Sequence, residues 1–470
     1  MHRMIRLLTP VLGALILAGC SVTAPYQRPA AVVAPAWDQR ATELQTGAQS
    51  DAQSDTATAV APDWWRRFGN AELDRLMEQA LAANHDLGAA IARIERARAA
   101  LGVADADRYP AVNLSGGANR SHSDRGGDSE SSQLALNVAY EIDLWGARRA
   151  SIDAAGAGLE SSIYDRDALA LVLQSEVAAN YFQILSLKDR LAIAHRNLDA
   201  ARQVMRLVQT RYELGANTGL EVAQQRTSVL NQEAQIPQLE QSLAASQTAL
   251  ALLLGELPQD FRVEGASLEG LLVPEVAAYQ PPELLERRPD IRSMEAQLIA
   301  ARANIAIARA ALYPRVSLSA SAAASGIITS GSSLVASLAA SLAQTIFDGG
   351  RLQGQEQQAQ AREMELIRQY LQSVLTGQKE VQDSLVAVSA SRSRQLLLDQ
   401  AVLQAQEAYR IASVRFEAGA QDLLTLLDSQ RTQLQAEDSR IQAALARLTA
   451  TVTLYKALGG GWRSEDAGRS

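Results

Sequence analysis

The sequence has little of what enzyme sites are made from. Of its 470 residues, one is cysteine and four are histidine, so an intrachain disulfide is excluded and no metal-ligand cluster of these residues can be drawn. We also find no glycine-rich phosphate loop and no nucleophile elbow. The sequence therefore predicts no enzyme, no metal and no bound cofactor.

Aromatic residues make up only 4% of the chain, whereas hydrophobic residues make up 47%. This composition, rich in Ala, Leu, Gln, Arg and Glu, is typical of long helices and coiled coils. The formal net charge of -8 argues against nucleic acid as a partner. After Leu17 no strongly apolar run has the length of a transmembrane helix, so a membrane crossing would have to use strands.

The first 19 residues predict a lipoprotein signal peptide. Arg3 and Arg6 precede the apolar run 7–17, which is too short to span a bilayer and ends just before Cys20. The Cys20 thiol would accept a diacylglycerol, and an N-acyl chain such as palmitate would complete a stable anchor. Ser21 in the next position indicates sorting to the outer membrane. The alternative is a chance cysteine after an ordinary signal peptide.

The second half of the chain repeats the first at an interval of about 204 residues. Each repeat has a helix, a Tyr-Pro pair, a charge-poor segment rich in Ser and Gly, and a long helical hairpin that turns at Gly. Repetition of this kind is typical of a shaft rather than of a single catalytic pocket. The matched residues are Asp86, Arg98, Tyr109, Pro110, Arg211 and Gly215, which recur as Asp290, Arg302, Tyr313, Pro314, Arg415 and Gly419.

Apolar residues recur every seven positions on both arms of both hairpins, which predicts left-handed coiled coils. Pro237 is expected to kink or locally break the first return arm. The first hairpin carries Val177, Ile184, Leu191, Leu198, Met205 and Tyr212 going out and Val222, Val229, Ile236, Leu243 and Leu250 returning; the second carries Ile367, Val374, Val381 and Val388, then Leu427, Leu434, Ile441, Leu448 and Tyr455.

The two hairpin tips share a tetrad of Arg, aromatic, Glu and Gly. It begins at Arg211 and ends at Gly215 in the first repeat, and it runs from Arg415 to Gly419 in the second. Glycine supplies the left-handed residue that ends a helix, so a turn alone explains the Gly. Recurrence of the other three residues favours a partner contact at both tips.

Between the helices the apolar period changes to two. Leu134 to Leu144 alternates with polar residues, which predicts a strand with one apolar face. No charged residue occurs from Val316 to Phe347, and leucines four apart in that run would also suit a transmembrane helix. Its Ser and Gly content and the matching segment of the first repeat favour strands. Each repeat thus provides one β-hairpin.

Four strands per chain cannot close a barrel, because an open sheet edge in lipid leaves backbone hydrogen bonds unmet. Several chains must therefore assemble. Two copies would give eight strands with almost no lumen, and three would give twelve with room for a passage. The residues require an oligomer and leave the number of copies open.

The sequence resembles the TolC-like outer-membrane factors, and within them the lipid-anchored, NodT-type branch that serves resistance-nodulation-division efflux transporters. The resemblance covers nearly the whole mature chain. It is carried by the lipobox at Cys20, Trp64-Trp65-Arg66-Arg67-Phe68, Leu73 to Leu87, Arg287-Arg288-Pro289-Asp290-Ile291, both Tyr-Pro pairs, and Phe347-Asp348-Gly349-Gly350-Arg351.

The resemblance implies an α+β membrane protein: a homotrimer whose twelve-stranded β-barrel, four strands per chain, is continued by a coiled-coil α-barrel with an equatorial domain. Trp64 and Trp65 are expected to pack in that domain. The implied segments are signal peptide 1–19, lipidated linker 20–62, equatorial and first helices 63–108, β-hairpin 109–145, helical hairpin 146–256, equatorial connection 257–290, helix 291–312, β-hairpin 313–347, helical hairpin 348–459 and tail 460–470.

The implied function is a passive exit duct, anchored in the outer membrane and extending into the periplasm. It would conduct drugs or other small molecules delivered by an inner-membrane transporter through a periplasmic adaptor. The implied adaptor contacts are Arg211, Gly215, Arg415 and Gly419, and the implied pore gate is Leu424, Asp428 and Glu221. Ala420 and Gln421 stand where some members have a latching Arg, so that latch is not expected here. Asp428 also fits the simple polar face of a coiled coil.

Two other functions remain open at this point. A duct for type I protein secretion would differ in cargo but not in architecture. A periplasmic adaptor lipoprotein would also carry a coiled-coil hairpin, but it would show one hairpin and small β-rich modules instead of two hairpins with paired strand segments.

Overall fold

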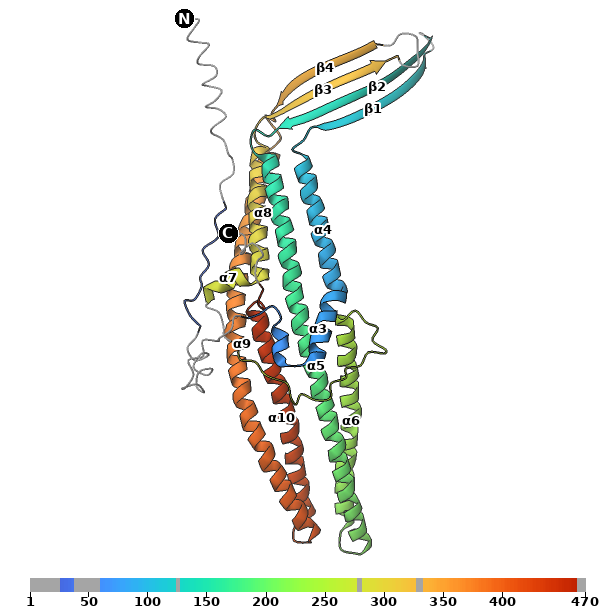
Figure 1. Ribbon diagram of the computed structural model, residues 1–470, viewed down its shortest axis with the longest axis vertical. Coiled ribbons are helices and arrows are strands. Elements are labelled where there is room, and N and C mark those ends of the chain that lie inside the picture. The colour runs from blue at the N-terminus through green and yellow to red at the C-terminus, as the bar shows by residue number, and fades with distance from the viewer. Residues whose placement is uncertain (1–25, 38–59, 124–126, 277–280, 327–332, 463–470) are drawn as a thin grey trace. The chain divides into compact units, whose positions relative to one another are not determined.

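The computed structural model describes residues 26–37, 60–123, 127–276, 281–326 and 333–462 (Figure 1). Cys20 lies outside these residues. The described chain forms two compact units. The first contains residues 91–164 and 290–373 with the segment up to Ala31, and the second contains residues 32–90, 165–289 and 374 onward. Helices α5 (Ala147–Glu213) and α9 (Arg351–Glu417) each contribute residues to both units.

The first unit contains one four-stranded antiparallel sheet in the order β1-β2-β3-β4. Its strands are β1 (Ala111–Ser123), β2 (Gly127–Ile142), β3 (Arg315–Ser325) and β4 (Ser333–Ala343). Both predicted β-hairpins are therefore confirmed, and the charge-poor run of the second repeat forms strands, not a helix. Figure 1 shows the four strands side by side in chain order, with β1 and β4 at the two edges.

The strand register gives the sheet one apolar and one polar face. Leu136 lies opposite Leu114 on β1 and Ala322 on β3, whereas its neighbour Asn137 lies opposite Asn113 and Ser321. Side chains alternate between the two faces of a strand, so these two rows lie on opposite sides. A sheet with this pattern suits a barrel wall that has lipid outside and water inside.

Helices α4 (His85–Ala106) and α8 (Pro289–Ala310) precede the two β-hairpins, and each has 22 residues. Ion pairs join α8 to the start of α9 within the first unit: Arg302 to Glu363 at 2.9 Å and Arg309 to Glu356 at 2.8 Å. The first six residues of α4 belong to the second unit, so the expected segment 63–108 is divided at residue 90.

The internal duplication is reproduced in the lengths of the long helices. Helices α5 and α9 have 67 residues each, and their return partners α6 (Gly219–Leu253) and α10 (Leu423–Ala457) have 35 each. Helices α5 and α9 begin 204 residues apart, at 147 and 351, and so do α6 and α10, at 219 and 423. The two predicted helical hairpins are thus confirmed.

The second unit is built around an aromatic core. The short helix η1 (Trp64–Phe68) buries Trp64 and Trp65, and the Trp64 ring stacks on Tyr455 with centroids 4.9 Å apart. The tryptophans therefore pack as predicted. Helix α3 (Ala71–Ala83), the turn η2 (Pro281–Glu283) and α7 (Leu284–Arg287) complete this unit, and each contributes buried apolar residues.

Most of the predicted seven-residue positions face this core or the hairpin seams. Val177, Ile184 and Val381 are completely buried, whereas Tyr212 at the first tip is 47% exposed. Among the described residues one helix, α5, is long and apolar enough to cross a membrane by length and composition, but half of its most apolar window is buried inside the protein. Packing in the core accounts for that window.

The sequence predicts a kink or a local break at Pro237; the break is wrong, and the kink stays a prediction. Helix α6 continues through Pro237 to Leu253. Proline removes one backbone hydrogen bond of the helix, but Ile236 beside it is 92% buried, and Leu243 and Leu250 one and two heptads further on pack against the core. Seam packing on both sides of the proline compensates for the lost bond.

Candidate functional site

The two hairpin tips have the same backbone geometry. Gly215 and Gly419 have φ angles of 75° and 74°, in the left-handed region that favours glycine. The next residue in each tip donates its N–H to the carbonyl of the tetrad arginine, Ala216 to Arg211 and Ala420 to Arg415, both at 2.8 Å. A repeated sequence therefore gives a repeated turn.

Each return helix begins with a side-chain cap. Thr218 accepts the N–H of Glu221, and the Glu221 carboxylate accepts the N–H of Thr218 at 2.6 Å, which is a reciprocal capping box. In the second tip the Asp422 carboxylate accepts the N–H of Thr425 at 2.7 Å. This bond holds the pKa of the Asp422 carboxyl below its usual range, because a hydrogen bond to the charged form favours ionisation.

Arg211 joins the two tips within one chain. Its guanidinium lies 4.9 Å from the centroid of the Phe416 ring and donates a 2.7 Å hydrogen bond to the carbonyl oxygen of Glu417. Phe416 belongs to a small apolar cluster, which both hairpins build from Val208, Ala412, Phe416, Leu423 and Leu426. The tips are therefore in direct contact, which no pattern in the sequence indicates.

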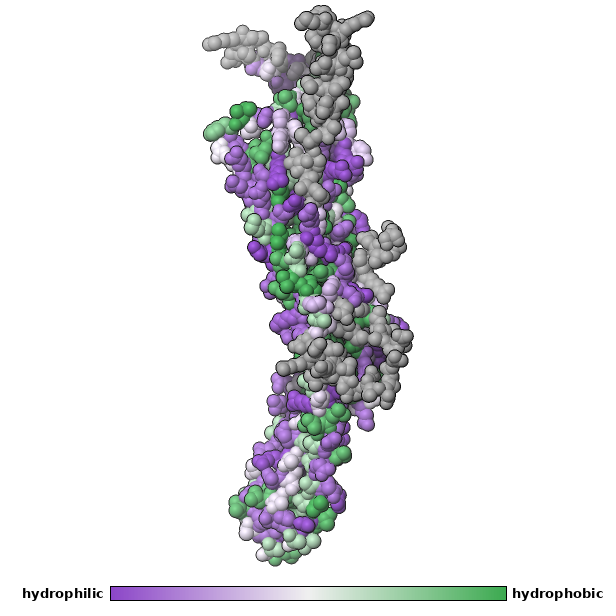
Figure 2. Space-filling view, turned by 90° about the vertical axis from the view of Figure 1, so that its left-hand side faces the viewer, coloured by the Kyte–Doolittle hydropathy of each residue, from purple (hydrophilic) through white to green (hydrophobic). Residues whose placement is uncertain are grey.

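The predicted gate residues lie in the first turns of the return helices. Leu424 is 67% exposed on α10, and the Asp428 carboxylate pairs with Arg431 at 2.6 Å with both side chains largely exposed. Glu221 is engaged in its capping box. Leu214 and Leu220 are also exposed, by 79% and 67%. Figure 2 shows apolar, green surface among polar, purple surface at this end of the hairpins.

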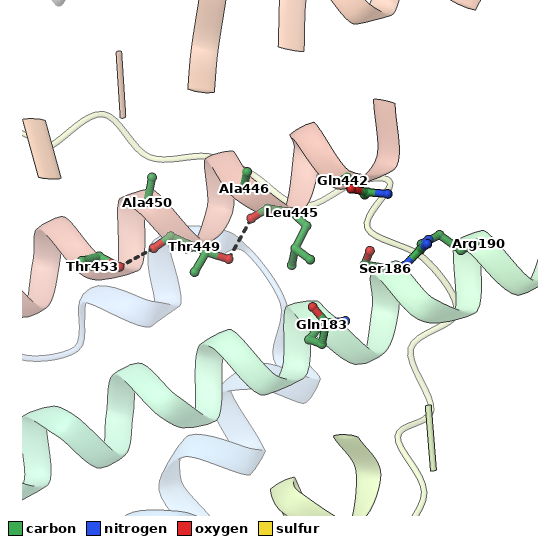
Figure 3. A pocket seen from close by; sticks show the side chains of 9 residues that line it. All are labelled: Gln183, Ser186, Arg190, Gln442, Leu445, Ala446, Thr449, Ala450 and Thr453. Atoms are coloured by element: carbon green, nitrogen blue, oxygen red, sulfur yellow. Dashed lines mark hydrogen bonds between the residues drawn. The ribbon is translucent and has the colours of Figure 1, made fainter. Parts of the chain in front are cut away.

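An open cleft of about 740 Å³ lies between α5 and α10 in the second unit. Figure 3 shows that Gln183, Ser186 and Arg190 enter it from α5, opposite the threonines and alanines of α10. Arg190 forms an ion pair with Asp438 on α10 at 2.5 Å, so its charge is neutralised. Thr449 donates its hydroxyl to the carbonyl of Leu445 in its own helix. The cleft is therefore lined by amides, hydroxyls and small apolar side chains.

The polar face of the sheet is made almost entirely of small residues. Ser321 and Ser337 lie opposite each other with their hydroxyl oxygens 2.8 Å apart, and Ser325 and Ser333 repeat this contact at the same distance. Within the described parts of the strands, charge enters this face only near its base, where Glu141 lies opposite Ser317 and Arg315 lies two residues from Ser317 on β3. The wall is thus smooth and nearly neutral.

A part-buried polar cluster that no motif indicated fastens the connection after α6 to α3 and α5. Glu72 accepts the N–H groups of Glu264 and Gly265 at 2.6 and 2.8 Å. Lys188 donates to the carbonyls of Val263 and Gly265 at 2.5 and 2.7 Å. Burial lowers the pKa of the Lys188 ammonium. In the described ranges no group of three or more His, Cys, Asp or Glu side chains is placed to hold a metal ion.

The chain combines two long helical hairpins with a sheet that has one apolar face, one polar face and two edge strands, β1 and β4. This is the fold of one protomer of a trimeric outer-membrane channel, in which the three copies together form the β-barrel. The family model described as "Outer membrane efflux protein" matches the chain twice, over residues 76–256 and 281–460. The chain belongs to this family, and it functions as an outer-membrane channel of efflux. The two matches coincide with the two halves of the internal duplication.

Named relatives support this assignment. The chain is 42% identical over 426 residues to the pyoverdine export outer membrane protein OpmQ of Pseudomonas aeruginosa, covering 86% of this chain and 88% of the relative. It is 32% identical over 470 residues to the probable efflux pump outer membrane protein TtgC of Pseudomonas putida, covering 97% and 96%. The open-state MtrE outer membrane channel of Neisseria gonorrhoeae superposes with a TM-score of 0.82 at 27% identity, covering 94% of this chain and 99% of MtrE. A separate adaptor lipoprotein is thereby excluded.

Proposed function

We propose that this channel is the passive exit duct of a tripartite pump, and that it couples at its hairpin tips to a periplasmic adaptor and through it to a resistance-nodulation-division transporter. One observation carries the proposal: both tips present the same turn, with exposed leucines beside Gly215 and in the first turns of the return helices. Because the turn is repeated, a trimer would present six copies of it. Energy comes from the transporter, not from this chain.

Substitution at the tip glycines tests this docking surface. Nothing lies within 4 Å of a Cβ placed on Gly215 or Gly419, so a larger residue there faces open space, but the positive φ strains most side chains. Asn tolerates this conformation and serves as the control, whereas Trp adds both strain and bulk. We expect the Trp variants to form trimers and lose efflux in a drug-resistance assay, and the Asn variants to keep it. Full resistance with Trp at both positions would remove the tips from the docking surface.

We further propose that a lipid on Cys20, with diacylglycerol and N-acyl chains, anchors the duct in the outer membrane. The described chain begins at Tyr26, and Arg28 then forms two hydrogen bonds with Glu295, at 2.6 and 2.8 Å. Tyr26 is six positions after Cys20, so the two residues lie at most about 20 Å apart. Incorporation of labelled palmitate that is lost in Cys20→Ala tests the anchor. A Cys20→Ala protein that still incorporates the label would contradict it.

The cargo we propose is pyoverdine or a compound of similar chemistry. The support is the identity of 42% and 39% to two proteins named for pyoverdine export, against 32% to 33% for those named for efflux of toluene, solvents or antibiotics. In a pyoverdine-producing strain that lacks its own export duct, this chain should restore secreted pyoverdine. Restoration of toluene tolerance without secretion of pyoverdine would reverse the assignment.

A further inference from the structure

The two repeats place matching residues at the tips, Arg, an aromatic residue, Glu and Gly, but give them different surroundings. In the first repeat Arg211 is half-buried over the Phe416 ring and donates to the carbonyl of Glu417. Phe416 itself is only 3% exposed. The first repeat therefore supplies an arginine, and the second repeat supplies the ring and carbonyl that receive it.

The counterpart residues Arg415 and Tyr212 are present, but they do not form the corresponding contact within the chain. Arg415 is the counterpart of Arg211, but it is exposed, and in the described part of the chain it has neither a side-chain hydrogen bond nor an ion pair. Tyr212 is the counterpart of Phe416, but it is 47% exposed. The second repeat thus ends in an arginine without a ring, and the first repeat offers a ring without an arginine.

The apolar surroundings differ in the same way. Leu207 packs against the cluster that joins the tips, whereas its counterpart Ile411 is 39% exposed. Val208 and Ala412 are also counterparts, and both lie in that cluster. The two tips thus share a backbone geometry but differ in which side chains are buried. The exposed counterparts Tyr212, Ile411 and Arg415 are therefore not covered by the contact within the chain.

Two repeats per chain and three chains give six hairpins in a closed ring, in which each hairpin touches two others. Contact between the first and second repeats occurs inside a chain, so contact between the second and first repeats must occur between chains. We propose that Arg415 stacks on the ring of Tyr212 of the partner subunit and donates to the carbonyl of Glu213 of the partner subunit. The tips would then be joined by six equivalent arginine–aromatic contacts, three within chains and three between them.

The residue types suit this contact. A planar guanidinium can stack on an aromatic face while its N–H groups donate in the ring plane, which an ammonium cannot do in the same geometry. The ring of tyrosine offers an aromatic face, and its hydroxyl can stay hydrated. Tyrosine therefore suits a position that is exposed to solvent before the subunits assemble. The inference rests on the trimer and not on the proposed adaptor, transporter or cargo.

Paired cysteines test the contact in the intact protein within outer-membrane vesicles. The test pair is Arg415→Cys with Glu213→Cys, and the matched control is Arg211→Cys with Glu417→Cys, 204 residues away in each case. A short bismaleimide should give covalent dimers and trimers with the test pair, and a link within one chain with the control pair. Single variants show any background from Cys20.

A test pair that links only within a chain, or not at all while the control pair links, would overturn the proposal. Trimer size is measured on the unlinked protein first. A protein that runs as a monomer would contradict the trimer on which the proposal rests. A trimer that forms no links between chains would contradict only the proposed contact of Arg415 with the partner subunit.

Side-chain substitution gives a second readout. Arg415→Ala should lower the temperature at which the trimer dissociates on a semi-native gel, and Arg415→Lys should recover part of that loss. Arg211→Ala should change trimer dissociation less, because its contact lies inside the chain. Equal effects of Arg211→Ala and Arg415→Ala, or no effect of Arg415→Ala, would contradict the assignment.

Discussion

The hydroxyl of Tyr181 donates to the carboxylate of Glu72 over 2.9 Å, and the same carboxylate receives the backbone N–H groups of Glu264 and Gly265. Three donors from two parts of the chain thus depend on one side chain that is 13% exposed. We expect Glu72→Ala to destabilise the connection after α6 by about 1–3 kcal/mol, because the part-buried N–H of Gly265 and the exposed N–H of Glu264 lose their acceptor. Faster limited proteolysis within residues 257–273 measures that local opening.

The matched control for this change is Glu78→Ala. Glu78 lies on the same helix, is 61% exposed and pairs with Arg66 at the surface at 2.8 Å. Exposed ion pairs contribute about 0–1 kcal/mol, so proteolysis should stay close to the parent rate. Equal protection in the Glu72 and Glu78 variants would show that the Glu72 carboxylate does not hold the connection.

Gly265 gives an independent prediction for the same cluster. A Cβ on Gly265 would lie 2.8 Å from the Tyr181 hydroxyl oxygen and 2.9 Å from both Glu72 Oε2 and Leu185 Cδ2. Gly265→Ala should therefore push the connection away and lower the midpoint of thermal dissociation, whereas Gly158→Ala, with nothing within 4 Å, should not. A Gly265→Ala protein as heat-resistant as its parent would show that the neighbouring side chains can move aside without cost.

Local periodicity predicted the elements of this fold well, because helix and strand formation depend mainly on neighbouring residues. The seven-residue series through Val177 and Val381 predicted the buried seams, and alternation around Leu136 predicted the sheet. Duplication also predicted equal hairpins, and the helices match residue for residue in length.

Contacts between distant segments were not predictable in this way. The stacking of Arg211 on Phe416 joins residues about 205 positions apart, and the bonds of Lys188 to the carbonyls of Val263 and Gly265 go to backbone atoms that carry no sequence signal. Pro237 does not break α6, because tertiary packing outweighs its local effect. Candidate sites built from such contacts become visible only once the hairpins are placed.

The cap at Asp422 should make the second tip sensitive to acid. Its pKa is lowered in the folded protein, chiefly by the N–H of Thr425, so the cap is fully effective above the ordinary Asp pKa of about 3.9 and is lost as pH falls through the lower folded value. A spin label on Cys at position 425, which keeps the backbone N–H, should become more mobile in acid. Asp422→Asn also caps but does not titrate, so it should remove the pH dependence.

The gate prediction concerns the first turns of α10. Leu424 and Asp428 lie one turn apart, and both are exposed in a single chain. Three leucines and three carboxylates around a narrow axis would hinder and select ions, so the double change Leu424→Ala and Asp428→Ala should raise single-channel conductance in a planar bilayer. Glu407→Ala breaks a similar exposed pair, with Arg410 on α9, and should leave conductance unchanged. Unchanged conductance in the double variant would remove both residues from the gate.

The base of the sheet should influence which ions pass through the barrel. Glu141 lies on the polar face opposite Ser317, and Arg315 lies two residues from Ser317 on the same face of β3. The rest of that face is Ser, Asn, Gln, Ala, Gly and one Val along the paired strands, so these two side chains dominate the charge of the wall. In a trimer each becomes a ring of three like charges.

Neutralising either the Glu141 ring or the Arg315 ring should leave the charge of the other ring unbalanced. Glu141→Gln should lower the ratio of cation to anion permeability, and Arg315→Gln should raise it, because a charged ring attracts counter-ions and repels ions of its own sign. Reversal potentials in a salt gradient measure the ratio, and Ser321→Ala on the same face provides a neutral control. Shifts of the same sign in both variants would contradict the placement of these residues in the lumen, because opposite charges at one level must act in opposite directions.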